Sequence, residues 1–151
     1  EEKARHILTI LPKAPFELIT GSAEAELVKY AGNCFFYFKI IFANLFYDVA
    51  LNKNIDWATV RSAVSADPRI GPSHMEPMHK SGRGAGGHCF IKDFAAFADI
   101  YEKLSAESLG TKVLHSLRDH NVDLLLQSGK DLDLLEGVYG KDFLDSRKNR
   151  K

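Results

Sequence analysis

The chain of 151 residues is long enough to bury the core of one domain. Its 20 basic and 20 acidic residues cancel, which excludes a general attraction to nucleic acid or to an anionic membrane surface. Two widely separated cysteines, and no charged-then-apolar leader, favour a soluble protein of the reduced cytoplasm over a disulfide framework.

The first 21 residues predict the end of a helix followed by a short strand. Residues 1–11 have helical periodicity and stop at Pro12 and Pro15, and residues 16–20 alternate as a strand does. A single strand cannot satisfy its own edges. We therefore expect its partners in sequence outside this chain, and we assign residues 1–21 to the tail end of another domain.

A long helix is predicted from residue 22 to about residue 51. Its centre is apolar on almost all sides, with Phe35, Phe36, Phe38, Ile40, Ile41, Phe42, Leu45 and Phe46. Lys39, Asn44 and Asp48 interrupt the apolar run, so we expect no membrane span. A domain of this size seldom surrounds such a helix, so we expect a second copy of the chain, or a second domain, to cover part of it.

Two polar side chains on this apolar helix need a partner. Lys29 and Asn33 are four residues apart and share a face, to which Asn44 returns within about 20°. A buried charge without a partner is costly. From the residues alone, the simplest explanation is an ion pair within the helix or between helices, for instance Glu26 with Lys29 or Tyr30.

Helical periodicity continues after the long helix. Asp56 can cap a short helix over residues 57–66, and a glycine- and proline-containing loop follows over residues 71–87. The pattern is helical again from Cys89 to Gly129. The predicted fold class is all-α, with a helical domain over residues 22–129 and a short helix with a basic tail over residues 130–151.

Residues 82–93 combine four glycines with a cysteine, a lysine and an aspartate. Glycines let a backbone approach a bound group closely, and a following helix directs its positive end to the same place. Cys89 lies at that junction near Lys92, a position that favours the reactive thiolate. An isolated cysteine is more commonly a small buried hydrophobe, so both roles stay open for this segment taken alone.

Three blocks of sequence carry a specific resemblance because they occur in one order with plausible spacing. They are Glu26-Leu-Val-Lys29-Tyr-Ala-Gly-Asn33, Asp67-Pro-Arg69-Ile-Gly71 and Gly86-Gly-His-Cys89-Phe-Ile-Lys92-Asp93. Over residues 24 to about 121, the chain resembles the central domain of the UDP-glucose/GDP-mannose dehydrogenase superfamily. The resemblance implies a helical central and dimerisation domain built on one long buried helix, and a homodimer formed through that helix.

The resemblance also implies an activity, that of an NAD-dependent nucleotide-sugar 6-dehydrogenase. Such an enzyme oxidises the C6 alcohol of a UDP-sugar to a carboxylate in two steps. Cys89 would attack the C6 aldehyde, and the thiohemiacetal would lose hydride to give a thioester that water hydrolyses. Lys29 would stabilise the oxyanion and Asn33 would bind the substrate. Asp93 would orient the water or take its proton.

Binding residues follow from the same resemblance. Gly86 and Arg69 would bind the nucleotide sugar, Arg69 reaching into the site of the partner subunit, and Lys92 would lie near the NAD pyrophosphate. The residues alone leave plainer roles open. Asp93 can cap a helix that starts at Phe94, Arg69 can be a surface charge, and Lys92 can be solvated.

The glycine loop departs from the family pattern. Ala85 stands where many members have an aromatic residue, and Gly-Gly-His-Cys is more typical of relatives that oxidise N-acetylated UDP-sugars. The block around Arg69 is of the UDP-glucose type, so UDP-glucose is the expected substrate and a UDP-N-acetylhexosamine the alternative. His74, His79, His88 and Cys89 can be drawn as a zinc site. They lack the tight spacing of metal ligands, so we expect no metal.

No Gly-x-Gly-x-x-Gly motif lies on a strand-to-helix turn. We therefore expect the main NAD-binding part of the enzyme in sequence outside this chain, and we expect the chain alone to be inactive. Two other hypotheses remain. One is a non-catalytic helical oligomerisation module with idle catalytic residues, and the other is a metal-binding helical domain.

Overall fold

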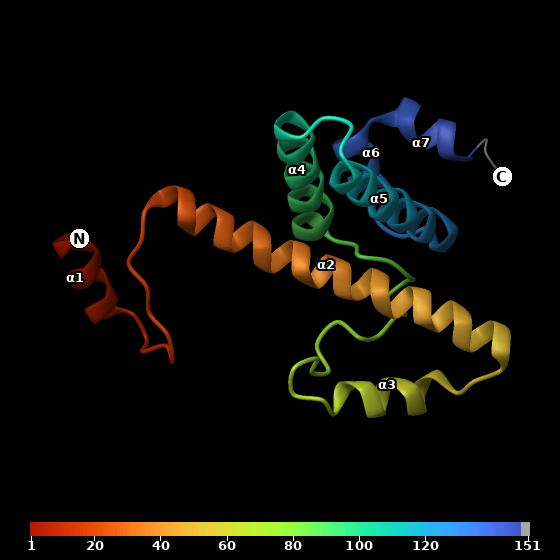
Figure 1. The fold of residues 1–151 in the computed structure, drawn as a ribbon, viewed down its shortest axis with the longest axis horizontal. Coiled ribbons are helices and arrows are strands. Elements are labelled where there is room, and N and C mark those ends of the chain that lie inside the picture. Colours follow the sequence, from red (N-terminus) through yellow and green to blue (C-terminus); the bar gives the residue numbers. More distant parts are fainter. Residues whose placement is uncertain (149–151) are drawn as a thin grey trace.

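The computed structural model describes residues 1–148, and all regular secondary structure within that range is helical (Figure 1). The helices are α1 (Glu2–Ile10), α2 (Ser22–Lys53), α3 (Trp57–Ser65), α4 (His88–Leu104), α5 (Leu109–Ser128), α6 (Leu132–Tyr139) and α7 (Lys141–Lys148). The all-α fold class is confirmed. Residues 149–151, the end of the predicted basic tail, lie outside the described residues.

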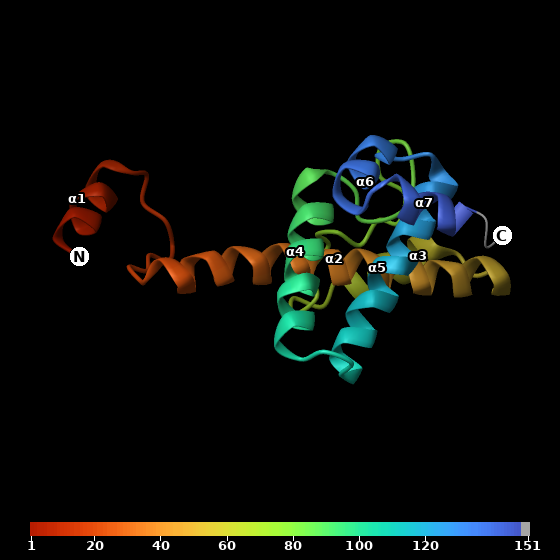
Figure 2. The same cartoon turned by 90° about the horizontal axis from the view of Figure 1, so that it is seen from above.

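The strand predicted over residues 16–20 is wrong. This segment is non-helical and mostly exposed, and no strand forms anywhere in residues 1–148. The physical reason is that a strand exists through pairing, and no second extended segment of the described chain lies beside this one. In both views α1 lies beyond the N-terminal end of α2, apart from the other helices (Figures 1 and 2).

Helix α2 is the axis on which the other helices are placed. Helices α4 and α5 pack against its middle, and α3 returns along its C-terminal half (Figure 1). Asn54, in the left-handed conformation, ends α2 by donating its amide to the carbonyls of Ala50 and Leu51. The predicted cap of α3 is confirmed, because the Asp56 carboxylate accepts hydrogen bonds from two amides of its first turn.

Two apolar clusters hold the first part of α4 in place. In the first, the rings of Tyr37 and Phe94 stack in parallel with centroids 3.9 Å apart, inside a core completed by α5. In the second, Ile91 packs with residues of α5, α6 and α7, including Leu135 and Leu144. The N-terminal part of α4 is therefore held next to α2.

One face of α2 stays exposed in a single copy of the chain, so the expected burial on most sides is not reached. Its large apolar residues are 45% to 64% exposed, and they are Leu27, Val28, Phe35, Phe42, Leu45, Phe46 and Val49. Length and composition alone would also allow α2 to cross a membrane. Its other face, however, packs against α4 and α5 and buries Asn44, as in the core helix of a globular domain.

Candidate functional site

Asp93 is the centre of a polar cluster between α2 and α4. Its side chain is 1% exposed, and its Oδ2 accepts a hydrogen bond from Asn33 Nδ2 at 2.5 Å. The same oxygen lies 3.1 Å from Lys29 Nζ, and Lys92 Nζ lies 3.5 Å from Oδ1. The structure thus brings together four of the residues that the sequence singled out.

Of two plainer roles suggested by the residues alone, the helix cap by Asp93 is wrong, whereas an ion pair of Lys29 is confirmed with a different partner. Asp93 does not cap a helix starting at Phe94, because α4 already begins at His88 and Asp93 lies inside it. Lys29 pairs with Asp93 rather than with Glu26. The reason for the second outcome is tertiary, since α4 presents a buried carboxylate to the Lys29–Asn33 face of α2.

The cluster is ionised at neutral pH. Burial by itself raises the pKa of the Asp93 carboxyl, but hydrogen bonds from Asn33 and Lys29 and the charges of Lys29 and Lys92 outweigh it. The pKa of Asp93 therefore lies below its ordinary value, and the hydrogen bond to Asp93 raises the pKa of Lys29. A carboxylate with a lowered pKa is a weak base, so it is better suited to orienting a water than to removing its proton.

The two cysteines lie in very different places. Cys89 is exposed in the first turn of α4, and Asp93 follows it by four residues, so both lie on one face of the helix. Cys34 is buried in the core between α2 and α4, and burial, with the charge of Asp93, raises its pKa to about 11. Cys89 is thus the thiol that a substrate can reach.

The glycine loop, residues 82–87, is held by side chains from two helices. Asn121 of α5 accepts from the Ala85 amide at 2.6 Å and donates to the Ala85 carbonyl at 3.1 Å. Arg83 donates to Asn44 Oδ1 of α2 at 2.8 Å and pairs with Asp48 at 2.7 Å. These bonds fix the segment that leads into α4 and Cys89.

Most glycines of the loop are required by packing. A Cβ on Gly82 would overlap Ser128, and one on Gly86 would overlap Asp131 Oδ2. Gly84 packs on Asn121 in the same way and has a positive φ of 90°, and φ at Gly87 is 84°. The loop backbone is therefore pressed onto the protein's own α5 and the α5–α6 junction, a close contact that the sequence pattern assigned to a bound group.

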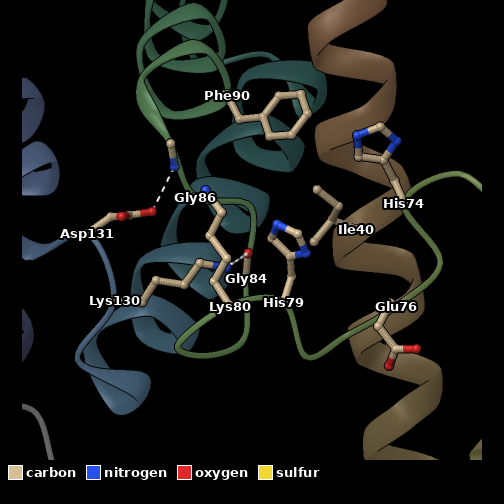
Figure 3. Close-up of a pocket in the computed structure, with 11 residues that line it drawn as sticks. Ile40, His74, Glu76, His79, Lys80, Gly84, Gly86, Phe90, Lys130 and Asp131 are labelled. Carbon is tan, nitrogen blue, oxygen red and sulfur yellow. Dashed lines mark hydrogen bonds between the residues drawn. The ribbon is translucent and has the colours of Figure 1, made fainter.

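A cavity of about 360 Å³ lies beside this loop (Figure 3), within the range of small-molecule sites. Its lining residues are Ile40, His74, Glu76, His79, Lys80, Gly84, Gly86, Gly87, Phe90, Lys130 and Asp131. Gly86, a predicted substrate-binding residue, is among them. The His74 ring stacks on Phe36 with centroids 4.3 Å apart and meets Phe90 edge-on at 5.5 Å. Burial first, then the charges of Lys39 and His79, lower the pKa of His74, which favours a neutral ring in the cavity wall.

Arg69 does not join the Asp93 cluster or the cavity lining. Its side chain is 87% exposed and bonds to Asp67 in its own turn. The alternative zinc site does not form either. Within residues 1–148, no three His, Cys, Asp or Glu side chains come together as metal ligands.

The sequence does not predict the parts played by Asn121, Lys130 and Asp131 in holding the glycine loop. Asn44 stood out as a polar residue on an apolar helix, but its partner Arg83 could not be read from spacing. Lys130 and Asp131 follow the end of α5 and have the composition of a solvated turn, although Lys130 is only 5% exposed. Their contacts depend on how α6 folds back.

A family model and several individual relatives agree on the family that this chain is similar to. The model of the UDP-glucose/GDP-mannose dehydrogenase family, central domain, matches residues 23–123. The chain is 31% identical over 84% of its length to the putative UDP-glucose 6-dehydrogenase YtcA of Bacillus subtilis, and 34% identical over 82% to the UDP-glucose 6-dehydrogenase AglM of Haloferax volcanii. It is 31% identical over 93% to the UDP-glucose 6-dehydrogenase YwqF of Bacillus subtilis. The chain spans 26% to 31% of the length of these three relatives.

Proposed function

Because the chain belongs to the UDP-glucose/GDP-mannose dehydrogenase family, whose central domain it matches over residues 23–123, we propose that the whole protein is an NAD-dependent nucleotide-sugar 6-dehydrogenase. UDP-glucose is the proposed substrate, since several relatives are named for it. One observation carries the proposal: exposed Cys89 lies one helical turn before the buried carboxylate of Asp93, which Lys29 and Asn33 hold in place.

The proposed reaction uses Cys89 as a covalent nucleophile. The C6 alcohol is first oxidised to an aldehyde, and the Cys89 thiolate then adds to C6, forming a C–S bond and an oxyanion. Lys29, held as an ammonium by Asp93, stabilises that oxyanion. Loss of hydride from C6 gives a thioester, and attack by water breaks the C–S bond, releasing the carboxylic acid while the second proton of the water returns to the Cys89 thiol. NAD, with Lys92 near its pyrophosphate, would supply the acceptor for the hydride of each oxidation, and the hydroxyl proton of the alcohol would pass to solvent.

Asp93, Asn33 and Gly86 have supporting parts in this proposal. The low pKa of Asp93 favours orientation of the attacking water over removal of its proton. Asn33, bonded to Asp93, presents its remaining amide groups to the substrate. The cavity beside Gly86, whose lining includes Phe90 but not Cys89, is proposed to receive a part of the nucleotide sugar away from C6.

Lys92 suits the proposed contact with the NAD pyrophosphate. Its side chain is 61% exposed and is tied to Asp93 only by a 3.5 Å ion pair, so the ammonium can reach a phosphate oxygen. The main NAD-binding part of the enzyme is proposed to lie outside this chain, in which case the chain alone does not turn over.

A homodimer completes the proposed site. The exposed apolar face of α2 suits burial against a second copy. The exposure of Arg69, which bonds to Asp67 in its own turn, supports the proposed contact with substrate in the partner subunit. The two free cysteines fit the proposed cytoplasmic location.

The full-length protein, assayed with UDP-sugars and NAD, tests the proposal. Cys89→Ala should abolish acid formation, while Cys34→Ala, the matched change of the buried thiol, should keep it. Mass spectrometry should find a sugar thioester on Cys89 when hydrolysis is slowed by Asp93→Asn. Acid formation by Cys89→Ala would overturn the mechanism. An intact dimer without activity on any UDP-sugar would favour the non-catalytic module.

A second arm of the assay concerns the substrate. UDP-glucose and UDP-N-acetylglucosamine are compared by kcat/KM in the same preparation. A higher value for UDP-glucose is expected, and the reverse order would assign the enzyme to N-acetylated sugars while leaving the role of Cys89 intact.

A further inference from the structure

The N-terminus of α4 has its acidic partner in a distant part of the chain. The first turn of a helix leaves amides without intrahelical acceptors, and a nearby carboxylate stabilises them. Helix α4 has no acidic residue in its first turn and no side-chain cap from its N-cap residue, Gly87. Instead, Asp131 Oδ2 accepts a hydrogen bond from the Gly87 amide at 2.7 Å, across 44 positions of sequence (Figure 3).

Lys130 holds the other end of the same loop. Its Nζ donates to the carbonyl of Gly84 at 3.1 Å and to that of Gly82 at 3.3 Å. The side chain is buried, which lowers the pKa of its ammonium against the opposing charge of Asp131. Lys130 and Asp131, which are adjacent in sequence, thus hold two carbonyls of the loop and the Gly87 amide at its end.

The turn that carries these two residues is itself well fixed. Asp131 has left-handed backbone angles (φ 53°, ψ 37°), which a non-glycine residue keeps only where its surroundings demand it. Its carbonyl accepts the amide of Leu135 in α6, and Leu135 is buried against Ile91 of α4. Docking of α6 on α4 therefore places the Asp131 carboxylate at the α4 N-terminus.

Both residues lie just past residues 23–123, which match the model of the family's central domain, whereas the loop that they hold lies within that range. The similarity to YwqF covers 93% of the chain and so includes both residues. The support of the proposed catalytic loop thus extends beyond the residues that match the central-domain model.

We propose that Asp131 is a positioning residue for the reaction: by capping α4 through Gly87, and with Lys130 anchoring the loop carbonyls, it holds the Cys89 thiol in its reactive place. The proposal rests on the proposed role of Cys89 as nucleophile. Asp131 and Lys130 line the cavity proposed to receive the nucleotide sugar, but the positioning role proposed for Asp131 acts through the backbone of residues 82–89.

Three variants of the full-length protein test the proposed positioning role of Asp131. Asp131→Gly removes the acceptor and suits the left-handed backbone without strain. Asp131→Asn keeps an oxygen acceptor and also tolerates that backbone. Asp133→Ala, two residues along and exposed in the first turn of α6, is the matched control.

Hydrogen exchange and steady-state kinetics are the two readouts. In Asp131→Gly, amides of residues 82–90 should exchange about tenfold faster while buried amides of α5 keep their protection. Its kcat should fall about tenfold with KM changed less than about threefold, since placement of the nucleophile matters mainly in the chemical step. Asp131→Asn and Asp133→Ala should stay within about threefold of the wild type in both readouts.

Three outcomes would overturn the proposed positioning role of Asp131. These are loop exchange and kcat of Asp131→Gly equal to those of Asp133→Ala, faster exchange spread evenly over the whole fold, or failure of Asp131→Asn to restore kcat. The exchange measurement does not depend on catalysis. Acid formation by Cys89→Ala would end the proposed mechanism and still leave the exchange result as a test of the cap on α4.

Discussion

Replacing Asn33 with alanine removes the hydrogen bond that its amide donates to Asp93 Oδ2, and leaves Lys29 and Lys92 in place. The Asp93 side chain is 1% exposed, so water cannot readily replace the lost donor. A hydrogen bond to a charged group contributes about 1.5–3 kcal/mol to stability. We therefore expect Asn33→Ala to lower the free energy of unfolding by about 2 kcal/mol at pH 7.

The matched control is Asn52→Ala on the same helix. Asn52 donates to the Asp48 carbonyl on the exposed side of α2, so its loss should change the free energy of unfolding by no more than about 0.5 kcal/mol. Urea denaturation followed by far-UV circular dichroism, at one fixed protein concentration, measures both variants.

The pH dependence separates a charged partner from ordinary packing. The pKa of Asp93 is lowered on folding, so its stabilising effect is present above the unfolded value of about 3.9 and is lost as the pH falls through the lower folded value. The gap between Asn33→Ala and the wild type should be full at pH 7 and narrow as the pH falls below about 4. A cost equal to that of Asn52→Ala, or a gap that does not narrow in acid, would refute Asn33 as the donor that holds this charge.

Two further predictions concern accessible groups. At pH 8 a thiol reagent should label Cys89 in the folded chain and spare Cys34, whose pKa burial raises to about 11; peptide mapping that found both labelled at similar rates would contradict the assignment. Phe46→Glu, on the apolar face of α2, should convert a dimer to a monomer in sedimentation with helical content retained, while Ile7→Glu, equally exposed on α1, should not. A wild-type monomer at micromolar concentration would overturn the proposed homodimer.

The helices are predictable where periodicity and end signals agree. The sequence predicts helices over residues 22–51 and 57–66, and the structure has Ser22–Lys53 and Trp57–Ser65 with the expected Asp56 cap. The strand over residues 16–20 fails because alternation is a local pattern, whereas a strand also needs a partner. Helix α7 was not predicted, since its helical register is set by burial of Leu144 against α5 and α6 rather than by its own periodicity.

The site is predictable only in part, for a similar reason. The spacing of Lys29 and Asn33, and that of Cys89 and Asp93, fixes which side chains share a helix face. It does not fix which face of α4 meets which face of α2. That packing buries Asp93 and also brings Asn33 and Lys29 to its carboxylate, and their hydrogen bonds outweigh burial and lower its pKa.

The glycine loop shows how a correct local inference can name the wrong partner. A high density of glycine indicates a group in close contact with the backbone. At Gly82 that group is Ser128, and at Gly86 it is Asp131, both of the same chain. Gly86 also lines the cavity proposed to receive the nucleotide sugar. The loop is thus packed on its own protein, and Lys130 and Asp131, which it contacts, line the cavity together with Gly86. Because this packing keeps the loop backbone from shifting, it holds Cys89 and the cavity wall in one geometry, which pre-organises the proposed site.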